Sequence, residues 1–308
     1  MRDFLALPEA AGTAVIVNEV GEIGLDGAIL MEETGGLRMA MLANGCVCCA
    51  LGSDLAATVA ELADSRSAPL HLIVLETSGL SKPGPILRGL ANLVVPRLRV
   101  SVVATFDCLR SSEVASFEEA AAQWAGAQAM VLTRRDVASG EQVEAARSMA
   151  RRVNPTAEII DFDDRRACVV AAFTQRRSAL VALPDFVGPP HPRIVVFLVR
   201  WIAKPAWDDL AFWLDNLAGL LGERLLRVKG VVAVEEVERP LLVQSVGTTF
   251  SGLRPFGGQI DTPFIVVIAR DASMDELAQV TPELPVVISR LGAPDPFARR
   301  AVGALRAG

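Results

Sequence analysis

The sequence has few side chains that bind metals through nitrogen, and it has no phenolic groups. Its 308 residues include two histidines, His71 and His191, and no tyrosine. Histidine is one of the commonest ligands of zinc and other transition metals. Any metal site in this chain is therefore expected to depend on cysteine thiolates and on Asp or Glu carboxylates.

The chain also lacks the features of membrane, secreted and nucleic-acid-binding proteins. No apolar run is long enough to cross a bilayer, and no apolar signal sequence follows the N-terminus. The five cysteines are an odd number with three of them clustered, which argues against a secreted disulfide framework. The net charge of −6 argues against nucleic-acid binding. We expect a cytoplasmic protein without a membrane or nucleic-acid partner, and the sequence does not define its oligomeric state.

The clustered cysteines form the motif Asn44-Gly45-Cys46-Val47-Cys48-Cys49. Thiolates are soft ligands that suit zinc, and adjacent cysteines such as Cys48 and Cys49 pair with each other only under strain. Free cysteines also pack as small hydrophobic residues, so a buried strand end is the simpler alternative. Asn44-Gly45 predicts a turn directly before the thiols, which favours metal or redox chemistry over packing.

A loop rich in carboxylates follows the first predicted strand. Residues 13–17 are apolar and mostly β-branched, which is typical of a buried parallel strand. The loop after this strand, residues 18–27, contains three glycines and carries Glu19, Glu22 and Asp26. Open α/β sheets bind ligands at the C-terminal ends of their strands. Because a thiolate cluster is expected nearby, we interpret these carboxylates as facing a metal rather than only solvent.

Two further predicted strands end in candidate nucleotide-binding residues. Residues 70–75 form an apolar strand that ends at Glu76, and Gly79 follows three residues later. A carboxylate at a strand end can hold Mg²⁺, and a glycine N–H can meet a terminal phosphate. Asp136 follows another strand, residues 127–132. Its carboxylate suits the two donors of a guanine edge, and a helix N-cap is an equally good interpretation.

The order of the predicted elements indicates an α/β fold with two domains. Strands alternate with helices through residues 1–182, which indicates a doubly wound, mostly parallel sheet. Residues 183–192 hold four prolines and are predicted to be a stiff linker. Residues 193–285 are then predicted to form a smaller α+β domain, which contains no cysteine, and residues 286–308 a tail.

In order and spacing, these motifs resemble those of the CobW-type P-loop GTPases, a family of metallochaperone-like proteins. The resemblance covers the chain from residue 1 to about residue 285 and is carried by Val17-Asn18-Glu19-Val20-Gly21-Glu22 with Asp26, Asn44-Gly45-Cys46-Val47-Cys48-Cys49, Glu76-Thr77-Ser78-Gly79-Leu80-Ser81-Lys82-Pro83, Thr133-Arg134-Arg135-Asp136 and Leu226-Arg227-Val228-Lys229-Gly230. It implies a P-loop-type sheet, here without its first strand and phosphate loop, followed by the C-terminal domain of the family.

The resemblance also implies a function in metal delivery. The family couples GTP binding and hydrolysis to the transfer of a metal to a metal-dependent client protein. Zinc is the commonest cargo, with cobalt or iron in some branches. Carried over to this sequence, Cys46, Cys48 and Cys49 would be the metal ligands, and Glu22 would be an additional one.

The nucleotide site implied by the resemblance uses the other motifs. Glu76 would hold the water shell of Mg²⁺, and Gly79 would sense the γ-phosphate of GTP. Asp136 would recognise guanine. Asp26 and Thr133 lie in matching motifs and are assigned to the same nucleotide site.

Two departures from the family pattern concern GTP. The family's Gly-rich phosphate loop would precede residue 1, and no G-x-x-x-x-G-K-[S/T] motif occurs in the 308 residues. Thr133-Arg134-Arg135-Asp136 also stands where the family has Asn-Lys-x-Asp. We therefore expect this chain to bind GTP poorly and to hydrolyse it negligibly. We also expect the native protein to begin upstream of Met1, because the chain starts inside a predicted helix.

Three functional hypotheses from different classes follow. The first is a GTPase switch whose nucleotide state controls a thiolate metal site. The second is a non-hydrolysing metal-binding or scaffold relative that has lost its nucleotide site. The third is a thiol redox protein that uses Cys46 with Cys48 or Cys49, although the chain lacks the Cys-x-x-Cys helix start that lowers a thiol pKa.

Overall fold

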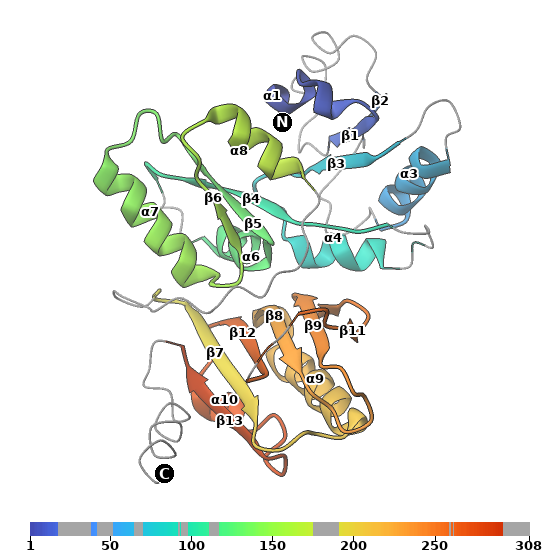
Figure 1. Cartoon of the computed structure of the whole chain (residues 1–308), viewed down its shortest axis with the longest axis vertical. Coiled ribbons are helices and arrows are strands. Elements are labelled where there is room, and N and C mark those ends of the chain that lie inside the picture. Colours follow the sequence, from blue (N-terminus) through green and yellow to red (C-terminus); the bar gives the residue numbers. More distant parts are fainter. Residues whose placement is uncertain are drawn as a thin grey trace. The chain divides into compact units, whose positions relative to one another are not determined.

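The computed structural model (Figure 1) describes most of the chain, namely residues 1–17, 38–41, 52–64, 70–91, 93, 98–110, 117–174, 191–258, 260 and 262–291. The chain divides into two compact units. The first comprises Met1–Gln123, Ala127–Ser139 and Glu158–Arg177, and the second comprises Trp124–Gly126, Gly140–Ala157 and Ser178–Gly308. Residues 124–126 and 140–157, which the sequence analysis assigned to the first domain, thus belong to the second unit.

Within the described residues, the first unit contains two parallel sheets of three strands each, in the orders β2-β1-β3 and β4-β5-β6. The strands are β1 (Thr13–Val17), β2 (Arg38–Met41), β3 (Leu72–Glu76), β4 (Val103–Asp107), β5 (Ala129–Thr133) and β6 (Glu158–Ile160). The helices are α1 (Arg2–Leu5), the 3-10 helix η1 (Pro8–Ala10), α3 (Gly52–Asp64), α4 (Pro83–Leu90), α6 (Glu118–Gly126) and α8 (Arg165–Phe173). The last three residues of α6, Trp124–Gly126, belong to the second unit. All four strand pairings are parallel, which confirms the predicted α/β class.

Strand β1 is covered on both faces. All five of its residues are buried. Val15 and Val17 pack in a cluster with side chains of α1 and α8, whereas Ile16 packs with side chains of α3 and α4. Successive side chains of a strand point to opposite faces, so a strand buried on both faces must be apolar throughout. The sheet around β1 is therefore doubly wound, as the sequence predicts.

Helix α8 packs against both parallel sheets of the first unit. Its Phe173 stacks on Phe4 of α1, with ring centroids 4.3 Å apart, and also joins a cluster with side chains of β5 and β6. The helix begins at a strong cap, because the carboxylate of Asp164 accepts hydrogen bonds from the backbone N–H groups of Arg166 and Ala167. A single helix therefore covers part of one face of each parallel sheet.

The second unit is built on an antiparallel sheet with the order β10-β9-β8-β12-β7-β13, and β11 pairs with β9. Its strands are β7 (Ile194–Trp201), β8 (Leu225–Val232), β9 (Leu241–Val246), β10 (Thr249–Phe250), β11 (Arg254–Pro255), β12 (Phe264–Arg270) and β13 (Val286–Arg290). Its helices are α7 (Gly140–Val153), α9 (Trp207–Leu221), the 3-10 helix η2 (Gly222–Arg224) and α10 (Met274–Ala278). Strand β13 pairs with β7, so the sheet extends beyond residue 285, where the sequence analysis placed the end of this domain.

Helix α9 covers one face of this sheet (Figure 1). Its Leu210, Trp213 and Leu217 are completely buried in a cluster with inward-facing side chains of β7, β8 and β12. Trp213 also meets Trp201 of β7 edge to face, with ring centroids 5.3 Å apart. Residues 210, 213, 214, 217 and 221 are buried at helical spacing, so α9 presents one apolar stripe to the sheet.

The opposite face of β8 carries two buried cations. Arg227 is 1% and Lys229 4% exposed, and both alternate with Val228, which points into the cluster under α9. The Arg227 guanidinium donates a 2.5 Å hydrogen bond to the carbonyl of Gly126, the last residue of α6. Lys229 Nζ donates to the carbonyl of Thr156, 3.1 Å away, shortly after the end of α7. These charges therefore satisfy carbonyls near the C-terminal ends of two helices, where cations are favourable.

Asn154 hydrogen-bonds the other carbonyls at the C-terminus of α6. Its Nδ2 donates to the carbonyls of Trp124 and Ala125, at 2.9 and 2.8 Å, and its side chain is completely buried. Its Oδ1 accepts from the backbone N–H and the hydroxyl of Thr156, at 3.1 and 2.7 Å. Together with the Arg227 bond, the last three carbonyls of α6 all accept hydrogen bonds from side chains, as buried polar groups require.

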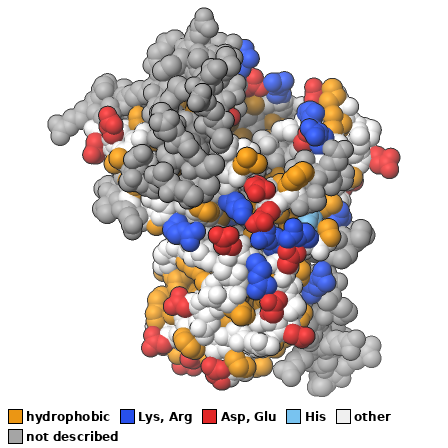
Figure 2. All heavy atoms as spheres, turned by 180° about the vertical axis from the view of Figure 1, so that it is seen from behind, with side chains coloured by type: hydrophobic (Ala, Val, Ile, Leu, Met, Phe, Trp, Pro, Cys, Tyr) orange, Lys and Arg blue, Asp and Glu red, His pale blue; other side chains and the backbone are white. Residues whose placement is uncertain are grey.

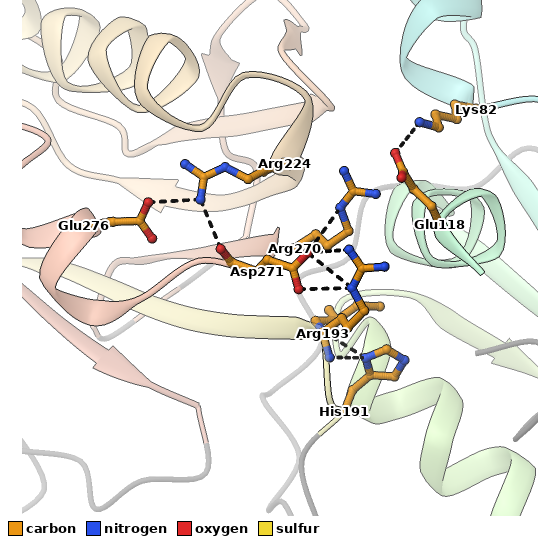
Figure 3. Close-up of polar contacts among 9 residues, drawn as sticks. Lys82, Glu118, His191, Arg193, Arg224, Arg270, Asp271 and Glu276 are labelled. Carbon is orange, nitrogen blue, oxygen red and sulfur yellow. Dashed lines mark hydrogen bonds and ion pairs between the residues drawn. The ribbon is translucent and has the colours of Figure 1, made fainter. Parts of the chain in front are cut away.

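A polar network at the end of β12 holds a strained residue (Figure 3). Asp271 has a positive φ of 48°, which is uncommon for a non-glycine residue. Its carboxylate accepts from Arg193, and these hydrogen bonds hold the pKa of Asp271 below its ordinary value. Arg224 donates to the Asp271 carbonyl and to Glu276, both at 3.0 Å. His191 Nδ1 accepts from the backbone N–H groups of Arg193 and Ile194, which fixes the start of β7.

The first prediction concerns Gly230 of β8. A Cβ at this position would lie 2.2 Å from the Phe264 carbonyl oxygen and 2.5 Å from the Ile265 Cα, both in β12. Gly230→Ala is expected to force the two strands apart and to lower the free energy of unfolding by about 1–3 kcal/mol in urea titrations. The control is Gly219→Ala, at an exposed position of α9 with nothing within 4 Å of the added Cβ, which should raise stability by about 0.5–1 kcal/mol. Unchanged stability of Gly230→Ala would contradict the close packing of β8 on β12.

The second prediction concerns the pH dependence of stability. Burial, reinforced by the charge of Arg227, lowers the pKa of Lys229 from 10.5 to about 8. Between these two values the unfolded chain binds more protons than the folded chain, so the free energy of unfolding rises with pH. From pH 8 to 10.5 the stability of the parent should rise by about 2–3 kcal/mol relative to Lys229→Met. No tyrosine ionises in this window. An exposed-lysine control, Lys204→Met, should run parallel to the parent, and parallel curves for Lys229→Met would refute the assignment.

Candidate functional site

Strand β3 delivers Glu76 and Gly79 to the surface of the first unit. Glu76 is the last residue of β3, pairs with Val17 at the end of β1 and is exposed. Residues 78–81 then form a turn, which we call the Gly79 turn. It is closed by a 3.0 Å hydrogen bond from Ser81 N to the Ser78 carbonyl and by a 3.0 Å contact between the two serine hydroxyls.

The folded conformation does not require a glycine at position 79. Its φ lies outside the left-handed region, and a Cβ built there would meet no atom within 4 Å. The space beside its Cα is therefore open. A glycine in such a place allows a ligand to approach the backbone closely.

Side chains of α6 hold the Gly79 turn, and no motif in the sequence predicts these contacts. Gln123 Nε2 donates to the carbonyls of Gly79 and Ser81, at 2.8 and 2.9 Å. Lys82, which directly follows the turn, points toward Glu118 of α6 and forms an ion pair with it (Figure 3). No local signal reveals these contacts, because the partners lie 36 to 44 residues apart in the chain.

Strand β5 delivers Thr133 beside the end of β4. Thr133 pairs with Asp107, and its hydroxyl donates to the Phe106 carbonyl at 3.4 Å. The Asp107 carboxylate accepts from Leu109 N at 2.9 Å and forms a two-point ion pair with Arg134, in which Arg134 Nε lies 2.9 Å from Oδ1. The Asp107 carboxylate therefore has partners within the protein. Arg134 has a positive φ of 58°.

Asp136 lies in the turn after β5 and is exposed. Helix α7 begins four residues later, at Gly140. Asp136 is therefore not the N-cap of α7, which removes the alternative interpretation that the sequence left open. The exposed carboxylate remains a candidate for binding a ligand.

The expected metal ligands Cys46, Cys48, Cys49 and Glu22 lie outside the described residues, as does Asp26. In the part of the chain that the structure describes, no group of three or more His, Cys, Asp or Glu residues could hold a metal ion. Strands β1 and β2 are parallel neighbours and end at Val17 and Met41, on the sheet edge where β3 ends. The last described residues of β1 and β2 therefore lie at the same end of the sheet as Glu76.

The structure describes two cysteines outside the cysteine motif, Cys108 and Cys168. Cys108 is buried. Cys168 Sγ contacts the Phe162 carbonyl at 3.1 Å, and desolvation raises the pKa of the Cys168 thiol. A reactive cysteine needs a lowered pKa, and the raised pKa of Cys168 is the opposite.

The face of the molecule in Figure 2 carries mixed charge. On the face in Figure 2, Lys and Arg side chains lie beside Asp and Glu side chains, without a large region of one sign. Within the described ranges, no helix is long and apolar enough to cross a membrane.

Comparisons with known proteins match both halves of the chain. A family model described as "CobW/HypB/UreG, nucleotide-binding domain" matches residues 1–161, and one described as "Cobalamin synthesis protein cobW C-terminal domain" matches residues 194–280. The chain is 25% identical over 304 residues to the zinc chaperone CobW of Sinorhizobium sp, with 80% of each protein covered.

Two other relatives match over shorter regions. The zinc chaperone CobW of Pseudomonas aeruginosa is 40% identical over 95 residues, which are 29% of this chain and 25% of that protein. The zinc-regulated GTPase metalloprotein activator 1 of Schizosaccharomyces pombe is 27% identical over 170 residues, 52% of this chain and 41% of that protein. This chain therefore spans less than half of these two relatives.

Solved structures share the fold. The Zn(II)-bound YjiA GTPase from E. coli superposes with a TM-score of 0.65 at 20% identity, with 92% of this chain and 93% of that chain covered. A Zn(II)-bound triple mutant of YjiA gives a TM-score of 0.68 at 22% identity. Because the nucleotide-binding family model covers 161 of the 308 residues, and a second model of the same family follows it, this chain belongs to the CobW/HypB/UreG family.

Proposed function

We propose that this chain is a GTP-dependent, metallochaperone-like protein that binds zinc through Cys46, Cys48 and Cys49 and delivers it to a metal-dependent client protein. The observation that carries the proposal is the presence of three thiols within four residues. Relatives that are named zinc chaperones support zinc as the cargo, and cobalt or iron would suit the same soft donors less well. A reducing cytoplasm would keep the thiols available for the metal.

The ligand number suits transfer of the metal. Three thiolates leave a fourth position of a tetrahedral zinc site for Glu22, for water or for a ligand from the client. An open position allows a client ligand to enter before the metal leaves, whereas a closed four-cysteine site would hold zinc as a structural ion. Thiolate ligands must lose their protons, so metal binding should weaken at low pH.

The nucleotide role rests on residues at the ends of parallel strands. We assign Glu76 to the water shell of Mg²⁺ and Gly79 to the γ-phosphate, and both are exposed after β3. The open space at Gly79 supports this assignment, because a phosphate oxygen needs access to the backbone N–H. Asp136 is assigned to guanine, and Thr133 and Asp26 to the same nucleotide site.

A second candidate function is a metal-binding or scaffold relative that does not hydrolyse GTP. The observation in its favour is the absence of a G-x-x-x-x-G-K-[S/T] motif from the 308 residues. Backbone N–H groups and a lysine of that motif normally hold the β- and γ-phosphates. Zinc binding without any response to GTP would favour this function over the first.

The third prediction is a stoichiometric zinc site on the cysteine motif. Titration of the reduced protein against a chromophoric zinc chelator should show tight binding of one ion that Mg²⁺ and Mn²⁺ do not displace, since thiolates prefer zinc. A triple variant with Cys46→Ser, Cys48→Ser and Cys49→Ser should lose this binding, and Glu22→Gln should weaken it. Cys168→Ser is the matched control and should bind as the parent does. If the triple variant competes as well as the parent, the zinc site lies elsewhere.

The fourth prediction is weak GTP binding by the 308-residue chain. Calorimetric titration with Mg·GTP should give a weak heat signal, because the sequence has no phosphate loop motif. Gly79→Ala should abolish the residual signal and change the free energy of unfolding by less than about 1 kcal/mol, since the added Cβ meets nothing within 4 Å. A submicromolar dissociation constant would contradict the expected weakness, and full binding by Gly79→Ala would contradict the phosphate role of Gly79.

A further inference from the structure

We propose that Gln123 is a positioning residue that holds the Gly79 turn, residues 78–81, against α6. It rests on the proposed function only for the phosphate role of Gly79. The hydrogen bonds that position the turn do not depend on that role.

One side-chain amide serves two carbonyls of the turn. Gln123 Nε2 lies 2.8 Å from the Gly79 oxygen and 2.9 Å from the Ser81 oxygen. An amide nitrogen carries two hydrogens, so both donors of this group are used on the turn. The turn itself is closed by Ser81 N and the Ser78 carbonyl at 3.0 Å. The hydrogen bond between Ser81 and Ser78 links the two ends of the turn. The two bonds from Gln123 therefore restrain all four residues of the turn together.

A second contact between α6 and this region is weaker. Lys82 and Glu118 form an ion pair, but their side chains are 32% and 35% exposed. Ion pairs that are this accessible to water contribute little, because solvent screens them and two long side chains must be ordered. The two amide bonds of Gln123, of which the one to Ser81 is partly buried and the one to Gly79 exposed, are directional and act on the backbone of the turn itself, whereas the ion pair acts on Lys82 after the turn.

Gln123 can restrain the turn because its own helix is fixed. Trp124 and Ala125, the next residues of α6, are 4% and 0% exposed. The last carbonyls of the helix accept hydrogen bonds from the buried side chains of Asn154 and Arg227. A glutamine on a frayed helix end would move with that end. Gln123 instead directly precedes the last three residues of α6, whose carbonyls are hydrogen-bonded.

The restraint matters because of the residue that it holds. Glycine has access to more backbone conformations than any other residue, and Gly79 meets no neighbouring atom at its Cβ position. Sterics within the fold therefore do not select one orientation of the Gly79 peptide groups. The bond from Gln123 to the Gly79 carbonyl selects one, and it lowers the entropy that a ligand would lose on meeting this backbone.

The test is hydrogen exchange of backbone amides in the full 308-residue chain. Peptides that cover residues 77–82 are followed in the parent, in Gln123→Met and in Gln123→Lys. Methionine has nearly the same length as glutamine and no donor, whereas lysine keeps N–H donors at a similar reach. Exchange in these peptides should become on the order of five- to tenfold faster in Gln123→Met, since two hydrogen bonds are lost, and Gln123→Lys should return it toward the parent value.

A matched control separates positioning from general destabilisation. Glu119→Met places the same side chain on the same helix, at a residue that makes neither of the two bonds to the turn, and should leave exchange at 77–82 unchanged. Urea titration should give the same stability for Gln123→Met, Gln123→Lys and the parent. The proposal is overturned if exchange at 77–82 is unchanged in Gln123→Met, if Gln123→Lys behaves like Gln123→Met, or if Glu119→Met raises exchange equally.

The same measurement distinguishes this proposal from the proposed function. Mg·GTP is added to the parent at a concentration high enough for weak binding. Protection of residues 77–82 on adding the nucleotide supports the phosphate role of Gly79. Absence of that protection counts against the nucleotide function, whereas the nucleotide-free difference between the parent and Gln123→Met still supports the positioning role of Gln123.

Discussion

The second unit depends on hydrogen bonds between buried cations and the carbonyls near the ends of two helices. The C-terminal carbonyls of a helix have no partner within the helix, and burying them unpaired is costly. Arg227 and Lys229 have the complementary problem, because burial removes the water that would solvate their charges, and it lowers the pKa values of both. The cations and the carbonyls are hydrogen-bonded to each other, and the buried Nε of Arg227 has no hydrogen-bond partner in the described part of the chain. Loss of either partner would leave a further buried polar group unsatisfied, so removing one of these side chains should destabilise the second unit.

The first unit is organised by parallel pairing rather than by polar contacts. Because β1, β2 and β3 run in the same direction, the segments after them begin at one edge of the sheet. This places the last residues of the three strands, Val17, Met41 and Glu76, at one end of the sheet, although they lie far apart in the sequence. Apolar side chains on both faces of β1 make the arrangement stable. The edge is thus free to carry exposed polar groups, as ligand sites on open α/β sheets do.

The region around Gly79 shows how a site can be held without being rigidly packed. The glycine has open space beside it, and the strand before it is fixed by its pairing with β1. The Gly79 turn itself is held against α6 by directional hydrogen bonds from Gln123. Hydrogen bonds of this kind can be exchanged for others at small net cost, unlike contacts in a close-packed core. A turn held in this way keeps one orientation at rest and can still yield to a ligand.

The sequence by itself determined the elements whose periodicity is strong and the motifs whose spacing is specific. The continuous apolar run of β1 and the apolar stripe of α9 at a spacing of 3.6 residues are local patterns, and the alternation of strands with helices indicates the parallel class of the first sheet. The sequence did not reveal α4, α6 or α8. Helix α4 is short and begins with two prolines within three residues, and α6 and α8 are short, rich in alanine and without a pronounced apolar stripe. Only the tertiary structure decided that Arg227 and Lys229 are internal, because their carbonyl partners lie 101 and 73 residues away. The same holds for Gln123, whose partners lie 44 and 42 residues away. Periodicity records which face of an element is buried, and it carries no information on which distant carbonyl will need a donor.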